Sequence, residues 1–124
     1  MKVEDVMNKI VVIDNDISVK EAAKIMSDKN LGCLVVMDDS VEGIITERDI
    51  MKNLDKVDSD VSKIMSKNVI TISPDASLDQ AAEIMTKNNI KKLPVMKGGK
   101  LLGIITATDI VANSDSLNEN FLLD

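Results

Sequence analysis

Two helical stripes of apolar residues, one in each half of the chain, dominate the hydrophobic pattern. In both, apolar side chains stand at positions i, i+3, i+4 and i+7, which places them on one face of a helix. The first stripe is Val19, Ala22, Ala23 and Met26, and the second is Leu78, Ala81, Ala82 and Met85. A capping-box pattern precedes each stripe, Ser18 with Glu21 and Ser77 with Gln80. We therefore expect each helix to begin just after its serine.

Short apolar runs flank these helices and predict strands. A first strand is expected before each helix, at Ile10 to Ile13 and at Val69 to Ile72. Two further runs follow each helix, Leu34 to Met37 with Val41 to Ile45, and Leu93 to Met96 with Leu101 to Ile105. Turn sequences join the members of each pair, so both pairs are expected to form hairpins. A last helix is predicted to start at Thr46 and at Thr106.

The same elements in the same order make the chain an internal duplication. The segment Gly-Ile-Ile-Thr-x-x-Asp-Ile occurs at 43–50 and again at 103–110. The predicted repeats are 1–58 and 59–124, each a β-α-β-β-α unit, and the fold class is α/β (α+β). One such unit exposes an apolar sheet face. We expect two units to pair these faces about an approximate two-fold axis, with two related clefts between them.

The composition narrows the possible chemistry. The 124 residues suit one compact module and include no histidine and a single cysteine, Cys33, in a predicted buried strand. Without histidine, serine–histidine and cysteine–histidine catalysis and histidine-bound metals are excluded. The carboxylates form no apparent catalytic pair or metal-binding spacing. We predict no enzyme activity, no metal site and no required cofactor.

Charge and hydropathy limit the classes of partner that the chain is expected to bind. The net charge of −6 and a single aromatic residue, Phe121, argue against binding to nucleic acid or anionic membranes. No apolar run approaches the roughly 18 residues that span a membrane, and the start of the chain lacks an apolar signal segment. These features predict a cytoplasmic location.

The repeated threonine and aspartate allow two interpretations. As structural residues, Thr46 and Thr106 cap a helix, and Asp49 and Asp109 complete the capping box. As ligand-binding residues, the threonine hydroxyl and the helix amides would bind phosphate, while the carboxylate would accept hydrogen bonds from a ribose diol. Arg48, the one arginine among 15 basic residues, lies between Thr46 and Asp49 and favours phosphate slightly.

These motifs resemble those of a stand-alone tandem pair of cystathionine-β-synthase (CBS) domains, a Bateman module. The resemblance runs from Val3 to about Ala112. It rests on Val-x-x-Val-Met at the start, on the segments 70–77 and 90–95, and on the repeated Gly-Ile-Ile-Thr-x-x-Asp-Ile. It implies two sites between the repeats for AMP, ADP, ATP or S-adenosylmethionine, each with adenine contacts from one repeat and ribose-phosphate contacts from the other.

The resemblance also implies the residues of each site. The first site would consist of Ile44, Thr46, Arg48, Asp49, Thr71, Ala76, Ile90 and Lys91. The second site would consist of Val12, Ile17, Leu31, Gly32, Ile104, Thr106, Thr108 and Asp109. In these sites the aspartate would hold the ribose, threonine, arginine and lysine would face phosphate, and aliphatic side chains would sandwich adenine.

Departures between the repeats predict unequal sites. Val12 stands where the other repeat has Thr71, and Gly32 stands where it has Lys91. The second site therefore has fewer polar groups and less positive charge. We expect the first site to bind nucleotide better.

The partners implied by the resemblance are a second copy of the module and an effector protein. The apolar residues Met51 and Leu54 after Thr46 and the apolar tail 116–123 give modest support for a homodimer, with the tail docked on its own domain or between subunits. The function predicted is that of a regulatory sensor of an adenosine ligand. The alternative left open is an interaction module without a ligand.

Overall fold

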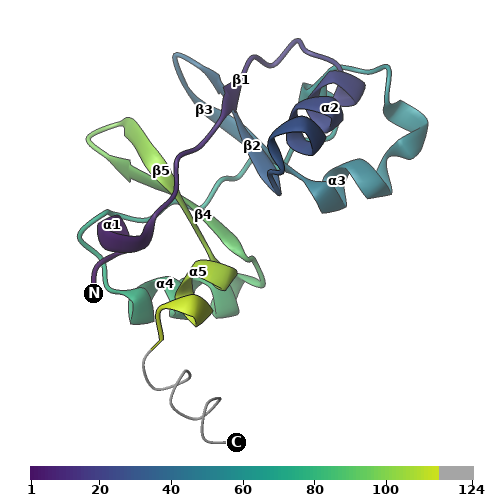
Figure 1. The fold of residues 1–124 in the computed structure, drawn as a ribbon. Coiled ribbons are helices and arrows are strands. Elements are labelled where there is room, and N and C mark those ends of the chain that lie inside the picture. The colour runs from purple at the N-terminus through teal and green to yellow at the C-terminus, as the bar shows by residue number, and fades with distance from the viewer. Residues whose placement is uncertain (115–124) are drawn as a thin grey trace, which may run out of the picture. The chain divides into compact units, whose positions relative to one another are not determined.

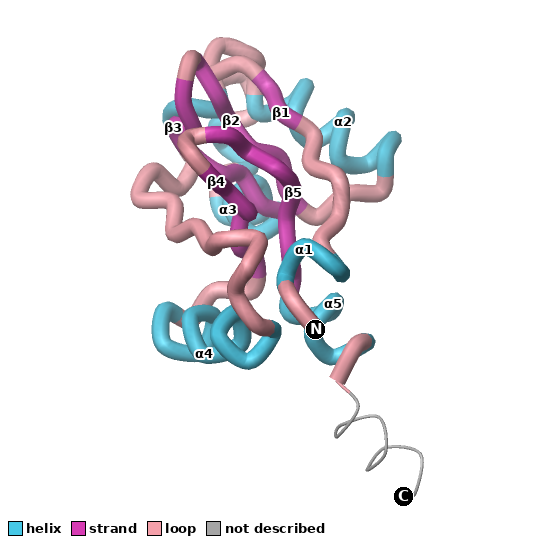
Figure 2. Tube along the Cα trace, turned by 90° about the vertical axis from the view of Figure 1, so that its left-hand side faces the viewer, coloured by secondary structure: helices cyan, strands magenta, loops and turns pink. Residues whose placement is uncertain are grey.

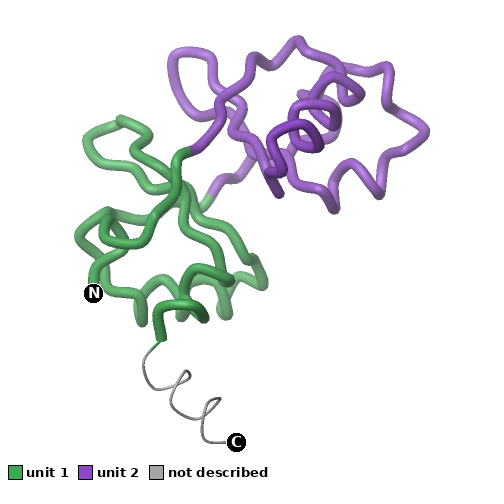
Figure 3. Tube along the Cα trace, in the orientation of Figure 1, with its two compact units in different colours: residues 1–9, 70–124 green, residues 10–69 purple. Residues whose placement is uncertain are grey.

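A computed structural model describes residues 1–114 and divides the chain into two compact units. Among the described residues, unit 1 consists of residues 1–9 and 70–114, and unit 2 consists of residues 10–69 (Figure 3). The tail 116–123 lies outside the described residues. The repeats at 1–58 and 59–124 remain a prediction about how the sequence is duplicated.

Unit 2 contains a three-stranded sheet and two main helices (Figure 1). Its elements are β1 (Val12–Ile13), α2 (Val19–Lys29), β2 (Cys33–Asp38), β3 (Ser40–Thr46), α3 (Glu47–Lys52) and the short 3-10 helices η1 (Leu54–Lys56) and η2 (Val61–Lys63). The strand order is β1-β2-β3, with β1 parallel to β2 and β2 antiparallel to β3. The predicted β-α-β-β-α order is therefore confirmed in this unit.

Unit 1 repeats this plan around a two-stranded hairpin. Its elements are α1 (Val3–Val6), α4 (Leu78–Asn88), β4 (Lys92–Lys97), β5 (Lys100–Thr106) and α5 (Ala107–Ala112). Helices α4 and α5 lie next to each other (Figures 1 and 2) and contribute Ala81, Met85 and Ile110 to one hydrophobic core with the hairpin. In unit 2, α2 and the sheet form the corresponding core around Ala22 and Met26.

Each unit also holds a short helical segment that precedes the first strand of the other repeat. The N–H of Val3 in α1 donates to the carbonyl of Ala76 at 2.8 Å, and the N–H of Val61 in η2 donates to the carbonyl of Ile17 at 2.9 Å. Both valines are fully buried. Thus α1 precedes β1 along the chain but completes the core of unit 1, and η2 precedes residues 69–72 but completes the core of unit 2.

The first strand differs between the units. In unit 2, the N–H of Val35 donates to the carbonyl of Val11 at 3.1 Å and helps to hold β1 on β2. Pro94 occupies the corresponding place in unit 1 and has no N–H to donate. The predicted strand at Val69 to Ile72 is therefore reduced to a single bridge between Ile72 and Val95.

Local signals placed the four main helices and the two hairpins correctly, whereas the strand predicted at Ile10 to Ile13 is shortened to Val12–Ile13. Ser18 and Ser77 cap α2 and α4, and the reciprocal capping box forms only at Ser77. The predicted hairpins form, with Asp39 at φ 64° in one turn and Gly98 and Gly99 at φ 59° and 76° in the other. Glycine adopts positive φ angles without steric cost, so Gly98 and Gly99 fit a turn that needs two of them in a row. Cys33 is buried in β2, as expected.

Candidate functional site

The start of α3 carries the first repeated threonine and aspartate as a closed capping network. The N–H and Oγ1 of Thr46 donate to Asp49 Oδ2 at 2.9 and 3.0 Å, and the N–H of Asp49 donates back to Thr46 Oγ1 at 3.3 Å. One turn later, the side-chain amide of Asn53 donates to the carbonyl of Asp49 at 2.7 Å. This network satisfies two of the amides that a helix start leaves without partners.

The start of α5 carries the same network with nearly the same lengths. The N–H and Oγ1 of Thr106 donate to Asp109 Oδ2 at 2.8 and 2.9 Å, and the N–H of Asp109 donates to Thr106 Oγ1 at 3.2 Å. Asn113 repeats the contact of Asn53 at 2.7 Å. The capping role of all four motif residues is confirmed.

Capping leaves part of each carboxylate available. Every hydrogen bond that the two carboxylates accept ends on Oδ2, and within residues 1–114 the Oδ1 atoms of Asp49 and Asp109 accept none. The threonine hydroxyls are already donating to the aspartates. A phosphate contact by Thr46 or Thr106 would therefore require its hydroxyl to turn away from the carboxylate.

One contact distinguishes the two networks. The side-chain amide of Asn8 donates to Asp109 Oδ2 at 2.7 Å. Ser66 occupies the corresponding place in unit 2, and its side chain forms no hydrogen bond with Asp49 or with any other of residues 1–114. The sequence analysis did not single out Asn8. The alignment of 3–7 with 61–65, extended by one residue, places Asn8 opposite Ser66 and was the available signal.

The adenine-side residues predicted in unit 2 lie at the sheet and at the end of α2. Val12 is in β1 and is 45% exposed, and Ile17 is partly buried just before the cap of α2. The N–H of Leu31 donates to the carbonyl of Met26 at 2.8 Å, and the carbonyl of Gly32 accepts from the N–H of Glu47 at 3.2 Å. Gly32 thus lies directly against the start of α3, next to Thr46, and Leu31 follows the end of α2.

The corresponding residues in unit 1 have the same local geometry. The carbonyl of Lys91 accepts from the N–H of Ala107 at 2.8 Å, and the N–H of Ile90 donates to the carbonyl of Met85 at 3.0 Å. Thr71 is exposed, and Ala76 is partly buried beside α1. Each unit therefore brings together one residue set from each predicted site. Ile44 and Ile104 lie within β3 and β5, and each stands five positions before the aspartate of its unit.

The two cations predicted for phosphate are exposed. Within residues 1–114 the structure contains one salt bridge, between Lys97 and Asp75, so neither Arg48 nor Lys91 is paired with a carboxylate there. Thr108, which stands at the place of Arg48 in unit 1, is also exposed. The positive charge at α3 has no counterpart at α5.

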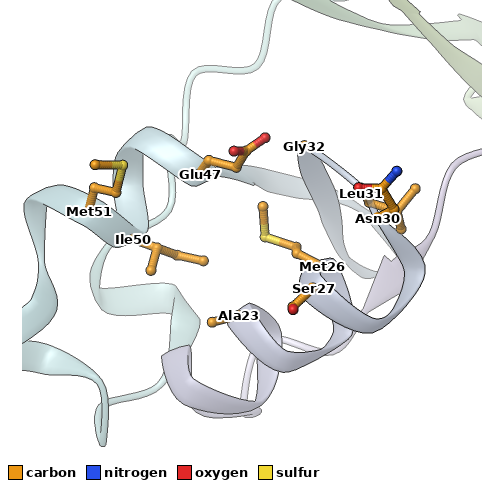
Figure 4. A pocket seen from close by; sticks show the side chains of 9 residues that line it. All are labelled: Ala23, Met26, Ser27, Asn30, Leu31, Gly32, Glu47, Ile50 and Met51. Carbon is orange, nitrogen blue, oxygen red and sulfur yellow. The ribbon is translucent and has the colours of Figure 1, made fainter.

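An open cavity of about 430 Å³ lies within unit 2, between α2 and α3 (Figure 4). Its lining consists of Ala23, Met26, Ser27, Asn30, Leu31, Gly32, Glu47, Ile50 and Met51. The side chains of Met26 and Ile50 point into the space between the helices. Met51 at its edge is 73% exposed, and Leu54 just beyond is 65% exposed, so unit 2 leaves this apolar edge uncovered.

Comparison with known families decides the classification. The family model described as "CBS domain" matches residues 3–56 and again residues 61–115. The chain belongs to the CBS domain family. Its two matches in tandem confirm the resemblance drawn from the motifs, and they make the chain a CBS pair.

Curated relatives of this CBS pair are longer proteins. An uncharacterised 17.7 kDa protein of Acidianus ambivalens is 44% identical over 82% of this chain, which covers 65% of that relative. Inosine-5'-monophosphate dehydrogenase of Thermoplasma acidophilum is 37% identical over 86% of this chain, which covers 22% of that enzyme. The chain thus spans less than two thirds of the length of these relatives.

Solved CBS structures match closely. A CBS-domain containing protein from Agrobacterium tumefaciens is 33% identical with a TM-score of 0.85, over 90% of this chain and 98% of that one. The CBS domain pair of protein MJ0100, crystallised with 5'-methylthioadenosine and S-adenosyl-L-methionine, is 35% identical with a TM-score of 0.85, over 90% and 94%. These matches confirm the mixed α and β fold of a CBS pair.

Residues 1–114 contain neither a metal-binding cluster nor a membrane-spanning helix. Within residues 1–114, no group of three or more His, Cys, Asp or Glu side chains is arranged to hold a metal ion. In the same part of the chain, no helix has the length and apolar character required to cross a membrane.

Proposed function

We propose that this CBS pair is a regulatory module that binds an adenosine-containing ligand and thereby changes its self-association or its binding to a partner protein. The observation that carries the proposal is the repeated threonine–aspartate network, in which each carboxylate keeps Oδ1 without a partner among residues 1–114. The adenosine ligands of the MJ0100 pair support the ligand class. We propose a regulatory and not a catalytic role.

In the first site, we assign the ribose to Asp49, because a carboxylate with a free oxygen can accept hydrogen bonds from a vicinal diol. We assign the phosphate to Thr46, Arg48 and Lys91. The two cations are exposed and have no carboxylate partner within residues 1–114, so a phosphate would be their counterion. The residues assigned to adenine are Ile44, Thr71, Ala76 and Ile90.

In the second site, Asp109 would hold the ribose, with Thr106 and Thr108 near the phosphate. The residues assigned to adenine are Val12, Ile17, Leu31, Gly32 and Ile104. This site lacks an arginine and a lysine at the positions of Arg48 and Lys91. Charge therefore favours AMP, ADP or ATP at the first site over the cationic sulfonium of S-adenosylmethionine, and the second site would bind nucleotide more weakly.

Thermal unfolding with AMP, ADP, ATP and S-adenosylmethionine tests the proposal. A ligand at 100 times its dissociation constant should add about 2.7 kcal/mol to the free energy of unfolding. Asp49→Ala should remove most of this stabilisation and leave only the weaker second site, while Asp109→Ala is the matched control because it breaks the same capping network. No stabilisation by any of the four, in protein freed of co-purified nucleotide, would contradict the proposal and favour an interaction module without a ligand.

We also propose that two copies of the chain associate through α3. The supporting observation is the apolar edge beside the cavity, where Met51 and Leu54 are 73% and 65% exposed. Exposed apolar patches of this kind are typical of protein interfaces. Light scattering after size-exclusion chromatography should give a dimer, and Met51→Lys together with Leu54→Lys should give a monomer with an unchanged melting temperature. A monomeric unsubstituted chain would contradict this proposal.

A further inference from the structure

The contact between Asn8 and Asp109 joins residues 101 positions apart in the sequence. An ionised carboxylate only accepts hydrogen bonds, so the nitrogen of the Asn8 amide must face it. Asp109 Oδ2 then receives three donors, from the N–H and hydroxyl of Thr106 and from Asn8, at 2.8, 2.9 and 2.7 Å. The corresponding oxygen of Asp49 receives two donors, both from Thr46.

The backbone holds Asn8 firmly beside β5. The N–H of Asn8 donates to the carbonyl of Ile104 at 2.8 Å, and the N–H of Ile104 donates to the carbonyl of Asn8 at 2.9 Å. Gly103 permits this approach, because a Cβ there would lie 2.6 Å from the Asn8 carbonyl oxygen. The position of Asn8 is thus built into unit 1 by two backbone bonds and a glycine.

Unit 2 builds the same position around Ser66. The N–H of Ile44 donates to the carbonyl of Ser66 at 3.0 Å, and the N–H of Ser66 donates to the carbonyl of Ile44 at 2.9 Å. Serine has a shorter side chain than asparagine and forms no bond with Asp49. The two units therefore present equivalent carboxylates beside equivalent backbone, and only the side chain at this position changes how many donors the carboxylate receives.

We infer that the residue at this position determines how well its neighbouring aspartate binds a ribose diol. Asn8 reduces the affinity of Asp109 for an adenine nucleotide, because a diol that donates one hydroxyl to each carboxylate oxygen finds Oδ1 without a partner but must compete with the Asn8 amide for Oδ2. Ser66 leaves Asp49 open to the same diol. This inference rests on the proposed function and adds a specificity-determining residue to it, one that acts through the aspartate it contacts.

A reciprocal exchange in single-site backgrounds tests the inference. In Asp49→Ala, which leaves the second site, Asn8→Ser should strengthen ATP binding about threefold to tenfold, the effect of one net hydrogen bond. Asn8→Ala should act like Asn8→Ser, since both remove the amide. In Asp109→Ala, which leaves the first site, Ser66→Asn should weaken ATP binding by the same factor. Calorimetric titration measures the dissociation constants, and melting temperatures verify that each variant folds.

The outcomes separate this inference from the proposed function. Nucleotide binding that both exchanges leave unchanged would overturn the role of Asn8 while the proposed function stands. A complete lack of ATP, ADP and AMP binding by the unsubstituted chain and by every variant would overturn both. Weaker second-site binding of ATP in Asn8→Ser and Asn8→Ala would be the opposite of the predicted effect, and would mean that Asn8 contacts the ligand instead of competing with it.

Discussion

Units 1 and 2 are built on one plan, and they differ where a few side chains change. Their helix starts carry the same threonine–aspartate network, with bond lengths of 2.9, 3.0 and 3.3 Å in unit 2 and 2.8, 2.9 and 3.2 Å in unit 1. The surroundings of the two networks differ in charge and in hydrogen bonding. The comparison teaches that the shared residues maintain the fold, and that the differing residues are the ones to examine for ligand preference.

Three differences point in the same direction. Arg48 faces solvent beside the cap of α3, whereas Thr108 stands beside the cap of α5. Asp49 has two donors on Oδ2, whereas Asp109 has a third from Asn8. The first difference favours phosphate binding by Arg48 beside Asp49, and the second leaves Asp49 as the stronger partner for a ribose diol. The third difference is that the second site has Gly32 where the first site has Lys91, so the second site has one positive charge fewer.

The largest effect in this comparison should come from adding a methyl group at the two glycines beside the caps. A Cβ at Gly103 would lie 2.6 Å from the Asn8 carbonyl oxygen, whereas at Gly43 the nearest backbone atom, the Ser66 carbonyl oxygen, would be at 2.9 Å. Gly103→Ala should lower the free energy of unfolding by about 1–3 kcal/mol, and Gly43→Ala by less. Urea unfolding measures both.

A larger loss of unfolding free energy in Gly43→Ala than in Gly103→Ala would contradict this prediction. At Gly43 the Met65 sulfur would lie 2.6 Å from the added carbon, but it belongs to a flexible side chain that can move. A larger loss in Gly43→Ala would mean that Met65 is held as rigidly as backbone.

A smaller and equal effect is expected from the two threonine caps. Thr46→Ala and Thr106→Ala remove the same bonds from helices of the same length, so each should cost about 1 kcal/mol. Equality within experimental error in chemical denaturation would support two equivalent caps. A cap that costs nothing in one unit would show that its network contributes no stability there.

The smallest effect concerns the missing strand of unit 1. Pro94→Val restores an N–H at the place where Val35 donates to Val11 in unit 2. The new hydrogen bond and the loss of proline's rigidity should nearly cancel, leaving a change below about 1 kcal/mol. Hydrogen exchange should nonetheless show a protected amide at residue 94. An amide there that exchanges as fast as in an open loop would show that something other than Pro94 limits the strand.

Local patterns predicted most of this fold because their causes are local. The caps at Ser18 and Ser77 and the Gly98-Gly99 turn depend on residues within a few positions of one another, so they can be recognised in the sequence. The motif at Thr46 and Asp49 was also predictable as a cap.

Long-range contacts set the limit of that prediction. The segments α1 and η2 pack with the helices of the other predicted repeat, and predicting this would require knowing that Val3 contacts Ala76, far along the chain. The bond from Asn8 to Asp109 spans 101 positions, and no periodic pattern announces it. The sequence analysis predicted a strand over Leu93 to Met96, and the effect of Pro94 on the first strand depends on a pairing register that only the structure shows.

The most direct test of the account is a calorimetric titration of ATP, ADP and AMP into the unsubstituted chain, Asp49→Ala and Asp109→Ala. The two variants lose the same cap, so any difference between them reports on ligand binding. The account predicts that Asp49→Ala keeps only the weak nucleotide binding of the second site, while Asp109→Ala retains the stronger binding of the first site. Binding lost in Asp109→Ala and retained in Asp49→Ala would contradict it.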